Sequence, residues 1–161
     1  MRFVELNDEL VRTENHHPPT DAREPLHVHP RQESGAKVLA GRLIFEVAGR
    51  QQEVACGEEI SIDANTPHRF WNPDPVEAVS VQFFRPALES AAFFETFFTL
   101  GQRGELTKGG APSLLQTAVM VPEFGDVIRL TRPPWPVVRA ICAVLRPIAL
   151  RRGYRARLAA S

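Results

Sequence analysis

Two histidines, His27 and His29, lie one residue apart in a short segment flanked by prolines. Side chains at positions i and i+2 of a β-strand share one face, so these two imidazoles are suited to bind one divalent metal ion. The pair alone also fits two exposed strand histidines. A third histidine, His68, follows after enough chain for several strands, and we predict a metal site on all three. The remaining histidines, His16 and His17, lie in a polar, proline-flanked stretch, and we expect them to be surface residues.

Short segments with strand character, separated by turn residues, surround these histidines. Gly41 marks one of the turns. The segment Asn72-Pro73-Asp74-Pro75 marks another, because proline fixes φ and removes a backbone donor. Many short strands at close spacing are typical of a sandwich or barrel rather than of a βαβ fold. We predict strands near 24–29, 35–40, 42–48, 51–55, 59–63, 67–72 and 76–84.

The segment around the first two histidines resembles the first motif of the cupin superfamily. That motif runs glycine, five residues, His-x-His, three or four residues, glutamate, six residues and glycine. His27, His29 and Gly41 match it, whereas the leading glycine falls on Asp21. His-x-His alone is a weak signal, so the resemblance depends on a second motif farther along the chain.

The segment around the third histidine resembles the second cupin motif. That motif runs glycine, five residues, Pro-x-Gly, two residues, histidine, three residues and asparagine, and Gly57, His68 and Asn72 match it. The Pro-x-Gly positions hold Asp63 and Asn65, and asparagine tolerates the left-handed φ of such a turn.

The resemblance covers residues 20–85. It implies a mainly β fold, a double-stranded antiparallel β-barrel of the cupin or jelly-roll type. It also implies one divalent transition metal, iron, nickel, zinc or manganese.

The acidic ligand of the first motif is the largest departure. Counting back from Gly41 by the family gap places it at Ser34, with Glu33 immediately before. In a strand over 33–40, Glu33 shares a face with Lys37, which favours Ser34 inside and Glu33 in solvent. A bulge after Pro30 would reverse this and make Glu33 the fourth ligand. We favour a three-histidine site, which resembles the iron sites of some cupin thiol and diketone dioxygenases.

Each ligand ring needs a hydrogen-bond acceptor for its other nitrogen, and Asn72 and Gln82 are candidates. We place Ser34 and Phe70 in the same pocket. An apolar lining that favours a partly hydrophobic ligand is suggested by Val38, Phe45, Phe70 and Phe83.

The pattern becomes helical after Pro86. We predict helices over 87–100, 113–121 and 134–150, and divide the chain into a barrel at 1–85 and a helical C-terminal extension at 86–161. The phenylalanines of the first helix are expected to dock on the barrel or on a partner chain. Acidic residues outnumber basic ones in the first part, and basic residues outnumber acidic ones in the second.

The sequence of the last predicted helix, 134–150, bears on which surface this helix contacts. Arg139 and Arg146 interrupt its apolar sequence, which is too short and too charged to span a bilayer. We expect it to pack on the barrel or on the second subunit of a homodimer. Peripheral contact with anionic lipid is the less favoured alternative. Nucleic-acid binding is not expected, because no aromatic residues alternate with the arginines.

Three functions fit these features. The first is a metalloenzyme acting on a small molecule, of a dioxygenase, decarboxylase or isomerase class, and the second is a non-catalytic binding or sensing protein. The third, a barrel that has lost its metal, conflicts with the intact histidine set. We favour an enzyme, but no catalytic residue follows from the sequence. The N-terminus lacks the apolar run of a signal peptide, and Cys56 and Cys142 lie far apart, so we expect a cytoplasmic protein.

Overall fold

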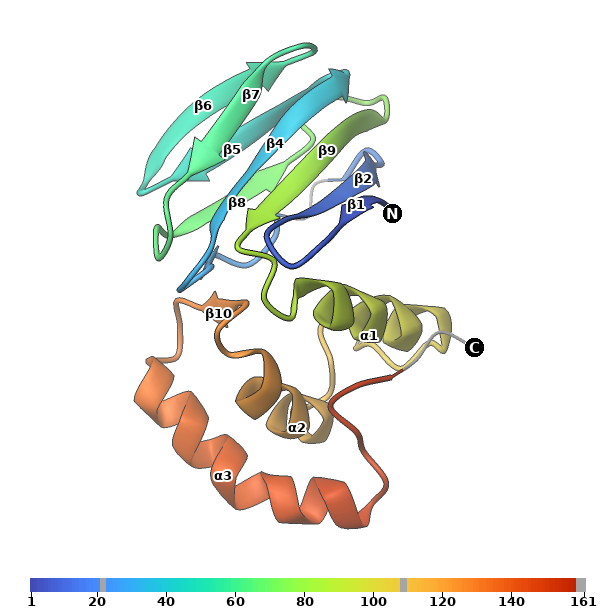
Figure 1. The fold of residues 1–161 in the computed structure, drawn as a ribbon, viewed down its shortest axis with the longest axis vertical. Helices are drawn as coiled ribbons and strands as arrows, with labels where there is room; N and C mark the ends of the chain where they lie inside the picture. The colour runs from blue at the N-terminus through green and yellow to red at the C-terminus, as the bar shows by residue number, and fades with distance from the viewer. Residues whose placement is uncertain (21–22, 108–109, 159–161) are drawn as a thin grey trace. The chain divides into compact units, whose positions relative to one another are not determined.

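The computed structural model describes residues 1–20, 23–107 and 110–158. The chain forms two compact units. The β unit comprises Met1–Leu88 and Ile128–Thr131, and the helical unit comprises Glu89–Val127 and Arg132–Ser161. Figure 1 shows the strands of the former and the helices of the latter.

The β unit contains two antiparallel sheets. Its strands are β1 (Arg2–Leu6), β2 (Val11–His17), β3 (His27–Val28), β4 (Glu33–Ala40), β5 (Arg42–Val47), β6 (Arg50–Ala55), β7 (Glu59–Ile62), β8 (His68–Trp71), β9 (Ala78–Arg85) and β10 (Arg129–Leu130). One five-stranded sheet has the order β1-β2-β9-β4-β7, and the other has the order β10-β3-β8-β5-β6. This arrangement confirms the predicted jelly-roll type of fold.

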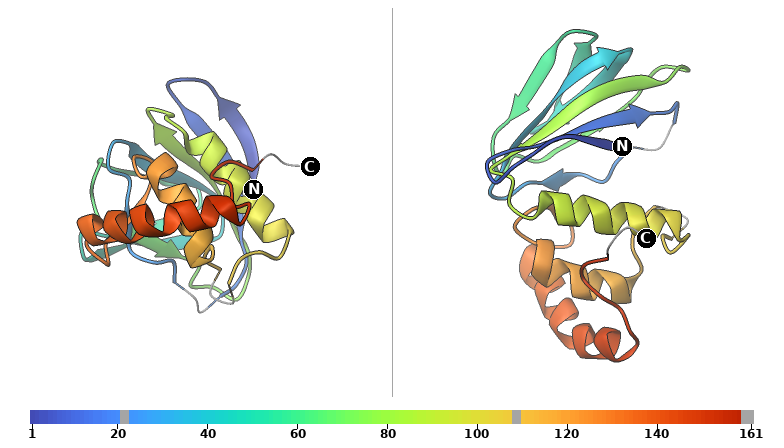
Figure 2. Two further views of the ribbon diagram at one scale, coloured as in Figure 1. Left: turned by 90° about the horizontal axis from the view of Figure 1, so that it is seen from below. Right: turned by 45° about the vertical axis from the view of Figure 1, so that its right-hand side comes forward.

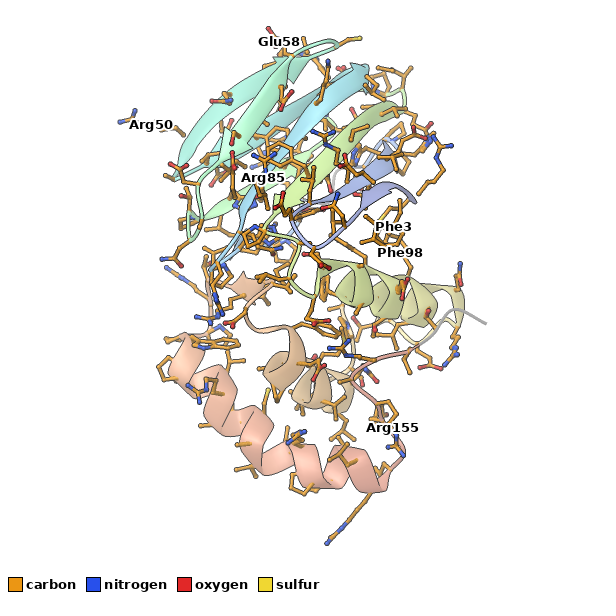
Figure 3. The ribbon with its side chains drawn as sticks, viewed as in Figure 1. Phe3, Arg50, Glu58, Arg85, Phe98 and Arg155 are labelled. Atoms are coloured by element: carbon orange, nitrogen blue, oxygen red, sulfur yellow. The ribbon has the colours of Figure 1, made fainter. Side chains whose placement is uncertain are left out.

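The core of the β unit follows from the alternation of side chains along its strands. In β4, Ala36 and Val38 are fully buried, whereas Lys37 between them is exposed. In β5, Leu43 and Phe45 are buried in the same way. The side chains of Val38, Leu43 and Phe45 each stabilise the fold by roughly 1.5–3 kcal/mol when they are fully removed from water. At the surface, Arg50 at the start of β6 and Glu58 before β7 project away from the sheets (Figure 3).

All seven predicted strands are present, as β3 to β9. Six differ from the prediction by small shifts of their ends, whereas the strand predicted near 24–29 is only the two-residue β3. The sequence did not reveal β1 and β2, because the residues of β2 are polar at most positions, although it pairs with β9 along its whole length. It also did not reveal β10, a two-residue strand that pairs with β3. Segment 128–131, which the sequence analysis assigned to the extension, therefore lies in the β unit.

The helical unit contains the three predicted helices, α1 (Ser90–Gln102), α2 (Leu114–Phe124) and α3 (Trp135–Arg151), which Figure 2 shows from two further directions. The Ser113 side chain caps α2 by accepting a hydrogen bond from the Gln116 amide. Phe93 of α1 packs edge-on against Phe124 of α2, with ring centroids 5.6 Å apart. Among the described residues, no helix is long and apolar enough to cross a membrane.

Candidate metal centre

The three candidate histidines come together at the end of one sheet. His27 in β3 and His68 in β8 are direct cross-strand partners, and His29 follows immediately after β3. The ring centroids of His27 and His68 are 4.5 Å apart, and those of His29 and His68 are 5.2 Å apart. One nitrogen of each ring lies within 4.8 Å of the others, and all three residues are buried. The cluster therefore has the composition and spacing of a metal-ligand set.

A turn before β8 fixes the third histidine relative to the first two. Asn65 has a φ of 61°, the left-handed conformation that the sequence predicted there. Its amide donates a hydrogen bond of 2.7 Å to the carbonyl oxygen of His29. The turn thus ties the segment before His68 to the segment that carries His29. Asp21, at the leading glycine position of the first motif, lies outside the described residues.

Backbone carbonyls orient two of the imidazole rings. The Nδ1 atom of His27 lies 2.9 Å from the carbonyl oxygen of Pro25, and Nδ1 of His68 lies 2.8 Å from that of Thr66. A carbonyl oxygen only accepts, so Nδ1 carries the proton in both rings, and Nε2 keeps a lone pair for a metal. The acceptors are backbone groups, not the side chains of Asn72 or Gln82 that sequence reasoning suggested. The sequence gives no signal for such acceptors, because every residue carries a backbone carbonyl.

Burial keeps the imidazoles neutral. Burial first, and the like charge of the neighbouring His68 second, lower the pKa of His27 from 6.5 to about 4. Burial also lowers the pKa of His68. Neutral imidazole is the form that binds a metal ion, so both rings are available as ligands at neutral pH.

Acidification is expected to destabilise the metal-free protein through His27. The pKa of His27 is 6.5 in the reference state and about 4 in the folded protein, so the unfolded chain binds more protons between these values. Stability is therefore complete above pH 6.5 and is lost as the pH falls towards 4, by roughly 3 kcal/mol in total. Urea unfolding at pH 7 and pH 4.5 measures the loss. The variant His27→Ala should lose less over this range, and an equal loss would contradict the assignment.

Glu33 does not belong to the histidine cluster. Its carboxylate accepts a hydrogen bond from the Ser61 hydroxyl and lies 3.9 Å from the guanidinium of Arg85. Its side chain is 38% exposed, whereas Ser34 beside it is buried. This is the arrangement that strand alternation favours. Within the described part of the chain, the metal-ligating group consists of three histidines and no carboxylate.

The variant Glu33→Gln is expected to change zinc affinity by less than about threefold, because Glu33 lies outside the histidine cluster. Loss of a residue that contacts a metal ligand would cost about tenfold or more. Calorimetric titration of the metal-free protein with zinc measures this change. Arg85→Gln, at the other end of the same ion pair, is the matched control and should behave like the wild type. A loss larger than tenfold in Glu33→Gln alone would restore Glu33 as a ligand.

The other predicted pocket residues have separate positions. Ser34 is opposite Phe84 in the β4–β9 pair, and the Phe84 ring packs edge-on against His29 at 5.1 Å. Gln82 lies two residues before Phe84 and shares its inward face. Phe70 also faces inward and stacks on Phe45 at 5.2 Å. Ser34, Gln82 and Phe70 therefore line the interior of the β unit.

Asn72 holds a turn, and Phe83 faces outward. The Asn72 amide donates to the carbonyl oxygens of His17 and Val76 and its oxygen accepts from the Asp74 amide, so it holds the turn after β8. Phe83 points to the outer face of β9, where its ring covers Gly35. The expectation that Phe83 lines the ligand pocket is wrong, because it alternates with the inward Phe84.

His17 is a further interior residue that sequence reasoning missed. Its Nε2 atom lies 2.9 Å from the Ser80 hydroxyl, and its ring packs edge-on against Phe70 at 5.3 Å. Burial lowers its pKa to about 4. The expectation of a surface residue is therefore wrong for His17, whereas His16 is exposed. Alternation within β2 would have given the signal, had that strand been recognised.

A pocket of about 120 Å³ opens beside His17. Its lining residues are His16, His17, Pro18, Thr20, Glu24, Phe70, Trp71 and Asn72. The volume is that of a few water molecules or a small organic group.

Comparison with known proteins gives the same fold. A family profile described as the cupin domain matches residues 16–82. The structure of KdgF from Halomonas sp. is similar at 18% identity and a TM-score of 0.51, over 56% of this chain and 82% of that one. A protein from Thermus thermophilus aligns at 19% identity and a TM-score of 0.49, over 53% and 80% of the two chains. A search of curated proteins finds no match.

The matched segment contains all three candidate ligands and the strands β3 to β8, with most of β9. The KdgF structure supports the same two-sheet fold at low identity. Residues 16–82 of the chain therefore form a cupin domain.

Proposed function

We propose that this protein is a metal-dependent cupin that binds one divalent transition metal ion on His27, His29 and His68 and acts on a small molecule there. The observation that carries the proposal is the buried cluster whose ligand nitrogens lie within 4.8 Å of one another. Zinc–nitrogen bonds of about 2.0–2.1 Å require nitrogens roughly 3.4 Å apart, which small ring movements supply. The residues present therefore fit a metal ion.

The chemistry follows from the donor set. Held by His27, His29 and His68, a divalent ion would keep its full charge and would supply Lewis-acid chemistry. The chain's own residues orient the imidazoles through the carbonyls of Pro25 and Thr66. Phe84 packs beside His29 and limits the access of water on that side. These features support a small-molecule enzyme of the dioxygenase, decarboxylase or isomerase class. We also propose, from the sequence alone, that it acts in the cytoplasm and as a homodimer.

The experiment is metal analysis of the purified protein, followed by oxygen uptake with a panel of diketones, thiols and phenols. We expect about one divalent ion per chain and metal-dependent turnover that His68→Ala abolishes. The control is Arg50→Ala, which removes an exposed side chain that projects away from the sheets. Metal-dependent ligand binding without turnover would instead support a binding or sensing protein. Turnover that persists in metal-free His68→Ala would overturn the proposal.

A further inference from the structure

The two inner faces of the β unit differ in polarity. On β5 and β8 the inward side chains include Phe45 and Phe70, which stack on each other. The inward positions of β2, β4 and β9 include several polar residues: Thr13, Asn15, Ser34, Ser80 and Gln82. A ligand between these faces meets an aromatic wall on one side and hydrogen-bonding groups on the other.

Most of the deeply buried polar groups on this wall have partners within the protein. The Thr13 hydroxyl accepts a hydrogen bond of 2.9 Å from the Asn15 amide, and the Ser80 hydroxyl pairs with His17. Ser34 differs, because its Oγ atom has no hydrogen-bond partner among the residues that the structure describes. Only 3% of Ser34 is exposed. A buried hydroxyl without a partner costs free energy, so Ser34 Oγ is free to donate a hydrogen bond to a bound ligand.

The position of Ser34 relates that hydroxyl to the histidine cluster. Ser34 is directly opposite Phe84, and cross-strand partners share one face of a sheet. The Phe84 ring contacts His29, so Ser34 and the cluster border the same part of the interior. Gly35, next in β4, lies under the Phe83 ring on the outer face and confirms that Ser34 points inward.

We propose that Ser34 is a positioning residue that donates a hydrogen bond to an oxygen of a small oxyanion bound at the metal centre. The inference rests on the proposed function and specifies its substrate class, a small molecule with a carboxylate or enolate oxygen and an apolar body. A metal ion on three neutral imidazoles carries a net positive charge, which attracts an anionic oxygen. Ser34 adds a donor but no charge, so the ligand supplies the neutralising charge. Phe70, which lines the pocket beside His17, is the aromatic side chain open to its apolar part.

The test uses the full chain loaded with cobalt(II) at pH 7, titrated with benzoate and with pentane-2,4-dione, and followed by the visible absorption of the metal. The probe that binds the wild type more tightly distinguishes a carboxylate from an enolate ligand. Ser34→Ala should weaken that probe about tenfold, as expected for loss of one hydrogen bond to a charged group. Cobalt affinity should stay the same. Melting of the metal-free variant should occur no lower than in the wild type, because an unpartnered hydroxyl has been removed.

Ser61→Ala is the matched control, because Ser61 donates its hydroxyl to Glu33 outside the cluster. It should bind cobalt and both probes as the wild type does. Equal probe affinity in Ser34→Ala and wild type, or a lower melting temperature of the metal-free Ser34→Ala, would overturn the role of Ser34. Absence of probe binding to the cobalt-loaded wild type would do the same while leaving the metal site intact. Failure of the wild type to bind cobalt would overturn the proposed function itself.

Discussion

Replacing His27 and His29 together with alanine is expected to lower zinc affinity by more than about a hundredfold, because changing only the partners of metal ligands already costs about 10–100-fold. Both rings are buried and face the same point as His68, and one backbone acceptor orients the His27 ring. The variant leaves a single imidazole, which does not hold a divalent ion alone. Calorimetric titration with zinc at pH 7 measures the change.

The control for this variant is the double replacement of His16 in β2 and Glu77 immediately before β9, an exposed hydrogen-bonded pair. It should bind zinc as the wild type does. Circular dichroism should show both proteins folded, since the hydrophobic cluster of β4, β5, β6, β7 and β9 is untouched. Full zinc binding by the histidine variant would show that the ion lies elsewhere.

The largest effect on stability is expected at Gly35, which lies next to Ser34 in β4. A Cβ atom there would lie 2.1 Å from the carbonyl oxygen of Ile60 and 2.6 Å from the Phe83 ring. The ring can move, but the carbonyl belongs to the β4–β7 ladder, where Gly35 is opposite Ser61. Gly35→Ala should therefore cost about 3 kcal/mol, the upper end of ordinary overpacking, measured by urea unfolding.

A second glycine provides the comparison. Gly101 lies in α1, and a Cβ atom there would meet only the Leu106 side chain at 3.6 Å, an ordinary contact. Gly101→Ala should leave stability unchanged or raise it by up to about 1 kcal/mol, because alanine is the better helix former. Adding Phe83→Ala to Gly35→Ala should not restore stability, since the carbonyl clash persists. A Gly35→Ala protein as stable as the wild type would contradict the close packing of this strand.

The alternation of side chains between the two faces of a strand accounts for most of what could be predicted from the sequence. It separated Glu33 from Ser34 without any knowledge of the turn before them, because adjacent side chains of a strand point to opposite faces of the sheet. The same rule would have distinguished Phe83 from Phe84, yet Phe83 was assigned to the lining from its hydrophobicity alone. Hydrophobicity was misleading at this position, because the ring covers a glycine on the outer face of the sheet.

Other features depend on contacts that the sequence does not encode locally. The two-residue strand β10 is recognisable only from its pairing with β3, far earlier in the chain. The interior position of His17 required the β2–β9 register, and a strand with so many polar residues resembles a loop in sequence. The acceptors for His27 and His68 are backbone carbonyls, which every residue carries.

The most direct test of the metal site is a crystal structure of the zinc-loaded protein with anomalous data collected at the zinc edge. The account predicts one anomalous peak per chain, at about 2.0–2.1 Å from one ring nitrogen of each of His27, His29 and His68. For His27 and His68 that nitrogen should be Nε2, because Nδ1 donates to a carbonyl. A zinc-loaded crystal with no peak at these three rings, or with a peak bound by other residues, would contradict it.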